Sequence, residues 1–274
     1  MFKIAGFQLP VVFGRPESNL AVLLEKAEEA ARARAKLAIF PEAYLTGYCF
    51  RTKDEAMEVA EPVPGRSSNK IAEACKRLGI HAVYGTLERD GDRIFNAAVL
   101  VGPEGVVGVY RKAHLPFLGV DKLATPGDRP FRAYDIGGLK VGMLICYDGS
   151  FPEATRCLML EGADLVCLPT NWPTGGIGAA EYLTAARAYE NTIFFAAVNR
   201  VGDERGFHFI GRSRICGPDG RTLAEVWNEE PGVMYAEIDP VEARRKHLVR
   251  IPGEHEIDRV KDRRPDLYGR LERE

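Results

Sequence analysis

The sequence predicts one α/β domain folded as a four-layer α-β-β-α sandwich, in which helices cover the outer sides of two mixed β-sheets. Three observations predict this fold. Short apolar strands alternate with longer amphipathic helices along the whole chain of 274 residues. Glycine turns join several neighbouring strands, so the sheets must contain antiparallel as well as parallel pairs. About a dozen strands are expected, and so many strands tend to split into two packed sheets.

The first half of the chain alternates strands and helices and then forms hairpins. Its expected elements are strand 3–8, helix 16–36, strand 37–42, a helix from about Ser68 to Gly79, and the strands IHAVYGTLE, RIFNAAVLVG and VVGVYRK. The helices carry leucine or alanine at helical spacing, whereas LAIFPE is a continuous apolar run typical of a strand covered on both faces. Asp90-Gly91-Asp92 is a hairpin signal between the two longest strands.

The second half repeats this alternation. Its expected elements are the strands FRAYDI and LKVGMLIC, a helix at about 152–161, the strand ADLVCLP, a helix at about 179–190, the strands TIFFAAVN and HFIGRSRI, two more strands up to Asp239, a final helix and a charged tail. No linker or internal repeat divides the chain. Residues 1–274 are therefore expected to form a single domain, with about 252–274 as a C-terminal tail at a subunit interface.

Composition excludes several classes of function. Lys and Arg number 37 against 39 Asp and Glu, so no positive field is available for nucleic acid. No apolar run approaches the roughly 20 residues of a membrane span, and MFKIAGFQLP lacks the features of a signal peptide. The six cysteines form no C-x-x-C pair and no Cys/His cluster. We expect a cytoplasmic, metal-free protein without a nucleic-acid or membrane partner.

Cys146 is the first candidate for chemistry. It ends the apolar run VGMLIC and is followed at once by a sharp turn and by Pro-Glu, which opens a helix. A strand–turn–helix unit exposes a nucleophile and aims backbone N–H groups at the atom it attacks. The alternative is a buried core thiol. A cysteine nucleophile also needs a base, and His114 in RKAHLP is the nearest histidine to a motif without forming one.

Two charged residues also stand at strand ends. Glu42 closes LAIFPE, and Lys112 follows VVGVYR where that strand leaves the sheet. Ligands of α/β sheets collect at the carboxyl ends of strands, and a charge there must be solvated, paired or used. Glu42 alone could equally be a surface charge in a loop, and Lys112 alone is expected to be a solvated lysine.

The segments FPEAYLTGY, YRKAHLP and ICYDGSFPE resemble, in order and spacing, the three catalytic segments of the nitrilase superfamily of carbon–nitrogen hydrolases. The similarity continues through GADLVCLPTNWP and GRSRICGPDG to DRRPDLY. The resemblance implies the α-β-β-α fold, no cofactor, and a homodimer or higher homo-oligomer. It assigns Glu42 as general base, Cys146 as nucleophile forming a thioester, and Lys112, with the backbone N–H of Tyr147, as stabiliser of the oxyanion.

One departure from the family concerns its second glutamate, which in many members follows the lysine. KAHLPFLGVDKLATPG has no glutamate, and Asp121 is the nearest acid. A shorter carboxylate could take the same role, or Asp121 could be a surface charge.

The residues around the nucleophile indicate the substrate. Tyr147-Asp148 replaces the Trp-Glu of nitrilases, and the arginines of carbamoyl-amino-acid hydrolases are missing. We therefore expect a small neutral or amine-bearing amide that releases ammonia or an amine. N-carbamoyl-amine hydrolysis, nitrile hydrolysis, a metal-dependent phosphoesterase with Glu42 as a magnesium ligand, and a non-catalytic scaffold are the alternatives. The expected pocket residues are Tyr48, Phe117, Tyr147, Asn171 and Trp172, and each of the aromatic residues could equally belong to the core.

Overall fold

The computed structural model describes residues 1–272 of the chain. Two six-stranded mixed sheets form the centre of the molecule. The first sheet consists, in spatial order, of β14 (Gly232–Ile238), β1 (Phe2–Gln8), β2 (Leu37–Ile39), β3 (His81–Asp90), β4 (Arg93–Gly102) and β5 (Gly105–Arg111). The second consists of β13 (Thr222–Val226), β12 (Ser213–Cys216), β9 (Phe194–Asn199), β8 (Leu165–Thr170), β7 (Lys140–Met143) and β6 (Ala133–Asp135). Only β1–β2, β2–β3, β7–β8 and β8–β9 pair in parallel within these sheets.

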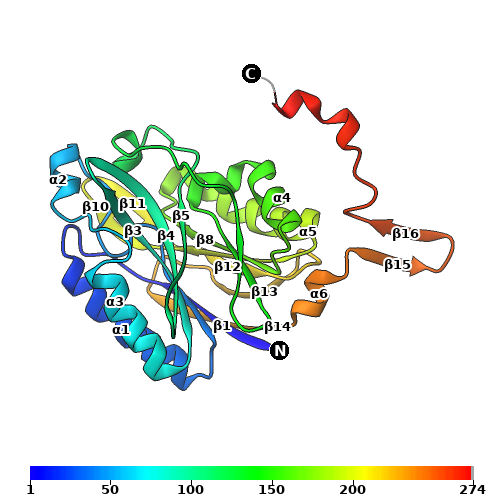
Figure 1. Cartoon of the computed structure of the whole chain (residues 1–274), viewed down its shortest axis with the longest axis horizontal. Coiled ribbons are helices and arrows are strands. Elements are labelled where there is room, and N and C mark those ends of the chain that lie inside the picture. Colours follow the sequence, from blue (N-terminus) through cyan, green and yellow to red (C-terminus); the bar gives the residue numbers. More distant parts are fainter. Residues whose placement is uncertain (273–274) are drawn as a thin grey trace.

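Helices cover the outer face of each sheet, which confirms the predicted four layers. The long helices are α1 (Pro16–Arg32) and α3 (Arg66–Leu78) on the first sheet and α4 (Pro152–Leu160) and α5 (Thr184–Asn191) on the second (Figure 1). Two short helices, α2 (Lys53–Met57) and α6 (Pro240–Arg244), lie in connections. The helix expected at about 179–190 begins with a π-helical turn over Ala179–Leu183 before it continues as α5.

The alternation of side chains along the strands divides the core into two layers. On β1, Ile4 belongs to the cluster between the two sheets, whereas its neighbours Ala5 and Phe7 belong to the cluster under the helices. Leu23 of α1 and Ile71 of α3 complete that outer cluster, and both are fully buried. Both faces of the sheet are thus apolar, which is why its strands are continuous apolar runs in the sequence.

The hairpins predicted from glycine turns are present. Asp90 pairs with Arg93 at the end of β3 and β4, so the turn between them is as short as expected. Between β6 and β7, the Asp135 carboxylate accepts hydrogen bonds from the N–H groups of Gly137 and Gly138 at 2.8 and 2.7 Å. These two glycines have positive φ angles of 88° and 101°, which glycine adopts without strain.

The prediction of HFIGRSRI as one continuous strand is wrong. Gly211 and Arg212 both adopt positive φ, at 62° and 58°, and interrupt it. The first piece, β11 (Phe207–Ile210), forms a two-stranded sheet with β10 (Val201–Glu204), outside the two large sheets, and the second piece becomes β12. An added Cβ on Gly211 would lie 2.4 Å from the carbonyl oxygen of Asn228, so close backbone approach requires glycine there.

The C-terminal segment also differs from the expected plain tail. It forms a hairpin of β15 (His247–Ile251) and β16 (His255–Asp258) followed by short turns, and it extends away from the sandwich (Figure 1). The glutamates and histidine around its Gly253 turn mask the strand pattern in the sequence. Within residues 1–272, no helix combines the length and the apolar character needed to cross a membrane.

Candidate active site

The three sequence-predicted catalytic residues stand just beyond the carboxyl ends of strands from both sheets. Glu42 follows β2 after two residues, Lys112 follows β5 directly, and Cys146 follows β7 after two residues. Gly85 of β3 allows the Glu42 segment to lie flat on the sheet, because a Cβ there would be 2.6 Å from Glu42 Cα. Ala43, the next residue, takes a positive φ of 46°, which turns the chain away behind the carboxylate.

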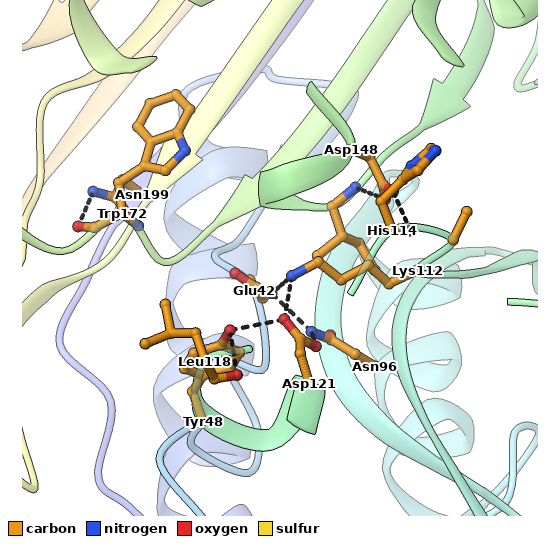
Figure 2. A network of polar contacts seen from close by, with 12 residues as sticks. Glu42, Tyr48, Asn96, Lys112, His114, Leu118, Asp121, Asp148, Trp172 and Asn199 are labelled. Carbon is orange, nitrogen blue, oxygen red and sulfur yellow. Dashed lines mark hydrogen bonds and ion pairs between the residues drawn. The ribbon is translucent and has the colours of Figure 1, made fainter. Parts of the chain in front are cut away.

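Glu42, Lys112 and Asp121 form one buried ion cluster (Figure 2). Lys112 Nζ lies 2.7 Å from Glu42 Oε1 and 2.5 Å from Asp121 Oδ2. Asn96 of β4 joins the two acids, since its Nδ2 donates to Glu42 Oε1 at 2.7 Å and to Asp121 Oδ1 at 2.9 Å. The side chains of all three charged residues are fully buried. Asp121 is therefore no surface charge, which removes that alternative.

Tyr48 contacts this cluster through its hydroxyl group. Its hydroxyl donates to Asp121 Oδ2 at 2.7 Å and lies 3.1 Å from the carbonyl oxygen of Leu118. Its ring packs on Gly119, where an added Cβ would lie 2.3 Å from a ring carbon. Burial raises the pKa of Tyr48 well above the usual value, and the charges of Asp121 and Glu42 add to this rise. The hydroxyl therefore stays protonated and can donate its hydrogen bond to Asp121.

The charges around Glu42 determine how readily it accepts a proton. Burial raises the pKa of Glu42, Lys112 opposes that rise and Asp121 adds to it. The pKa of Lys112 is raised although burial acts against it, because the charges of Glu42 and Asp121 outweigh the burial. Lys112 therefore stays an ammonium ion. One carboxylate oxygen, Glu42 Oε2, has no hydrogen-bond partner among residues 1–272.

Cys146 lies beside this cluster in a turn of unusual geometry. It opens a short 3₁₀ turn, Cys146–Ser150, and its φ is +45°, which is strained for a residue with a side chain. Burial and then the negative charge of Glu42 raise the pKa of its thiol to about 12, while the opposing effect of Lys112 is smaller. The charges of Glu42 and Lys112 thus both act on the thiol, which stays in its protonated form.

The expected pocket residues differ in their surroundings. Tyr48, Asn171 and Trp172 are buried, with 1%, 1% and 4% of their surface exposed. Tyr147 is 40% exposed at the nucleophile turn, whereas Phe117 is 92% exposed and lies on the surface. Both polar side-chain atoms of Asn171 lack a hydrogen-bond partner in the described part of the chain.

Two elements of the site escaped the sequence interpretation. Asn96 holds both acids, and its signal was a single polar residue in the middle of the apolar strand RIFNAAVLVG. His114, considered only as a base, has its ring nitrogen Nδ1 2.7 Å from the carboxylate of Asp148. Among residues 1–272, no group of three or more His, Cys, Asp or Glu side chains is arranged to hold a metal ion.

Comparisons with known proteins agree with this architecture. The family model for carbon-nitrogen hydrolases matches residues 3–247. The chain therefore belongs to the carbon-nitrogen hydrolase family, the nitrilase superfamily, and is an enzyme of that class.

Its relatives include proteins named for both nitriles and amides. A nitrilase of Pyrococcus abyssi is 37% identical, over 98% of this chain and 100% of the relative. An (R)-stereoselective amidase of Pseudomonas sp. is 36% identical, over 97% and 93% of the two chains. The solved structure of an amidase from Nesterenkonia sp. superposes with a TM-score of 0.81 at 26% identity, covering 98% of this chain and 96% of the other.

Proposed function

We propose that this enzyme hydrolyses a small amide through a thioester on Cys146, with Glu42 as general base and Lys112 as stabiliser of the oxyanion. The observation that carries the proposal is the buried Glu42–Lys112 pair, with Nζ and Oε1 2.7 Å apart, beside a thiol presented on a strained turn. Among the described residues the second oxygen of Glu42 is unpartnered, which leaves it available as a proton acceptor.

The reaction begins from a neutral thiol. Because the pKa of Cys146 is raised to about 12, the sulfur must lose its proton to Glu42 as it attacks the carbonyl carbon of the amide. The new S–C bond pushes the carbonyl electron pair onto oxygen. Lys112 has three N–H donors, of which two are directed to Glu42 and Asp121, so the third is available for this oxyanion together with the N–H of Tyr147.

The tetrahedral intermediate then loses its nitrogen. Glu42 returns the proton to the leaving nitrogen, the C–N bond breaks, and ammonia or an amine departs while the acyl group remains on Cys146. Water attacks the thioester carbon as Glu42 takes one of its protons. The C–S bond breaks, the sulfur recovers a proton and the carboxylic acid is released, so the site returns to its starting state.

Known relatives support an amide rather than an ester or phosphate substrate. A 2-oxoglutaramate amidase of Bacillus subtilis is 33% identical over 87% of this chain and 91% of the relative. In a glutamate mutant of the Nesterenkonia amidase, acrylamide is attached to the active-site cysteine by Michael addition. Because the Pyrococcus relative is named a nitrilase, nitrile hydrolysis is the second candidate, and the same nucleophile would attack the nitrile carbon.

The central experiment is the Cys146→Ala variant. We expect it to fold and to release no ammonia from any small amide, carbamoyl compound or nitrile that the wild type hydrolyses. The matched control is Cys157→Ala, which removes an exposed thiol on α4 and should leave the rate unchanged. Ammonia release at the wild-type rate by Cys146→Ala would refute the assignment. In a Glu42→Gln variant, intact-mass analysis should find the acyl group on Cys146.

We further propose that the chain forms a homodimer or a higher homo-oligomer through its C-terminal arm, residues 247–272. The arm extends from the sandwich and carries exposed apolar residues, among them Val249, Ile251, Leu267 and Leu271. Light scattering should give at least twice the 30.3 kDa mass of the chain. Ile251→Asp should lower that mass, and a monomeric wild type would contradict the proposal.

A further inference from the structure

Asp148 is a fully buried carboxylate with four donors around it. Its Oδ2 accepts from the N–H of Ile145 at 3.0 Å and from the hydroxyl of Tyr110 at 2.9 Å. Its Oδ1 accepts from the N–H of His114 at 2.9 Å and lies 2.7 Å from His114 Nδ1 (Figure 2). Since a carboxylate only accepts, Nδ1 must carry the proton in this contact.

The positions of the donors link two catalytic segments. Ile145 immediately precedes Cys146, at the end of the β7 segment in the second sheet. Tyr110 and His114 stand two residues before and two residues after Lys112, at the end of β5 in the first sheet. One carboxylate thus bonds to both flanks of the lysine and to the residue before the nucleophile.

Burying the carboxylate of Asp148 costs free energy, which indicates a specific role. No lysine or arginine of residues 1–272 pairs with its carboxylate, so hydrogen bonds alone offset the loss of hydration. The turn that it holds is strained, because Cys146 has φ +45°, and such a conformation persists only where its surroundings impose it. The backbone of Asp148 holds the same turn, since its N–H donates to the carbonyl of Ile145 at 2.9 Å.

We propose that Asp148 is a positioning residue, which holds the ammonium of Lys112 in register with the sulfur of Cys146 for the thioester reaction. This inference rests on the proposed function. In this role Asp148 acts only through the backbone and side chains that it holds. It connects the end of β5 in the first sheet, which carries Lys112, to the end of the β7 segment in the second sheet, which carries Cys146. Catalysis is sensitive to such placement, because an error of about 1 Å can cost on the order of a hundredfold in rate.

The test compares Asp148→Asn with Asp164→Asn in the full-length chain. Asp164 is also a buried carboxylate, and it accepts from the N–H of Lys140 at 2.9 Å at the opposite end of β7, where it also pairs with Arg244. Both substitutions put a carboxamide nitrogen among donors. We expect both variants to be less stable, but only Asp148→Asn to lose turnover.

The expected loss in Asp148→Asn is about ten- to a hundredfold in kcat, with KM changed by less than about threefold. The alkylation rate of Cys146 by iodoacetamide, followed by mass spectrometry, should fall in the same variant and stay at the wild-type value in Asp164→Asn. A purely structural role would lower the unfolding temperature in both variants and change kcat per folded molecule in neither, and that outcome would overturn the proposal.

Tyr110→Phe provides an independent arm that removes one donor and leaves the carboxylate in place. We expect a loss in kcat of roughly threefold or more, and no further loss when the change is added to Asp148→Asn. If Asp148→Asn does not fold, wild-type kcat in Tyr110→Phe refutes the proposal. Cys146→Ala is measured in parallel. Turnover by Cys146→Ala would refute the proposed function itself, whereas wild-type turnover by Asp148→Asn refutes only the positioning role.

Discussion

Replacing Asp121 by asparagine tests the charge balance of the ion cluster. The cluster holds two carboxylates and one ammonium, and Asp121 contributes three contacts to it. Its oxygens lie 2.5 Å from Lys112 Nζ, 2.7 Å from Tyr48 Oη and 2.9 Å from Asn96 Nδ2. A carboxamide has one oxygen and one NH₂ group in the same space, so the NH₂ group must face either Asn96 Nδ2 or the two other donors.

The magnitude follows from this mismatch. One buried donor loses its acceptor, which costs about 1–3 kcal/mol. Lys112 keeps Glu42 as a partner at 2.7 Å, so the ammonium remains paired and the cluster changes from a net charge of −1 to neutral. If the same energy is lost in the transition state, kcat/KM falls about ten- to a hundredfold, since roughly 1.4 kcal/mol corresponds to a factor of ten.

The pH dependence gives the sharper result. Glu42 must be ionised to accept the proton of the thiol, so activity falls in acid as this residue becomes protonated. The negative charge of Asp121 raises the pKa of Glu42. Removing that charge favours the ionised form, lowers this pKa and moves the acid limb of kcat/KM to lower pH.

The assay is ammonia release from a small amide across the pH range, with Asp128→Asn as control. Asp128 lies 3.0 Å from the guanidinium of Arg111, next to Lys112 in sequence, but its side chain is 43% exposed and outside the cluster. We expect the control to leave the acid limb in place. An acid limb that moves to higher pH in Asp121→Asn, or does not move, would show that Asp121 does not act on Glu42 as described.

Two further substitutions test the cluster and its support. Lys112→Met should reduce turnover a hundredfold or more and lower the free energy of unfolding by about 3–5 kcal/mol near neutral pH. Burial raises the pKa of Glu42 in the folded state. The loss of unfolding free energy should therefore be small below about pH 4 and grow as the pH rises. Urea unfolding that gives an equal loss at pH 5 and pH 8 would contradict this. Gly119→Ala adds a Cβ 2.3 Å from the Tyr48 ring and should cost about 1–3 kcal/mol more than Gly14→Ala, where φ is similarly positive but no atom lies within 4 Å. Equal unfolding midpoints for the two glycine variants would refute the contact.

Periodicity and turn chemistry predicted most of the fold because they are local properties. Apolar runs such as LAIFPE and glycine turns such as Gly137-Gly138 are visible without any knowledge of distant residues. The strand-end positions of Glu42, Lys112 and Cys146 followed in the same way. The errors lie where local patterns mislead, as at Gly211, where an apparently continuous strand is broken by two residues of positive φ.

The sequence by itself determined which chemical groups stand at strand ends, since strand boundaries depend on neighbouring residues. Tertiary structure alone decided which of those groups are buried and paired. Tyr48 and Asp121 are 73 residues apart in the chain yet 2.7 Å apart in space, and Phe117, close to Asp121 in sequence, lies on the surface. Burial and electrostatic coupling depend on atoms from many remote segments, and no local pattern records their sum.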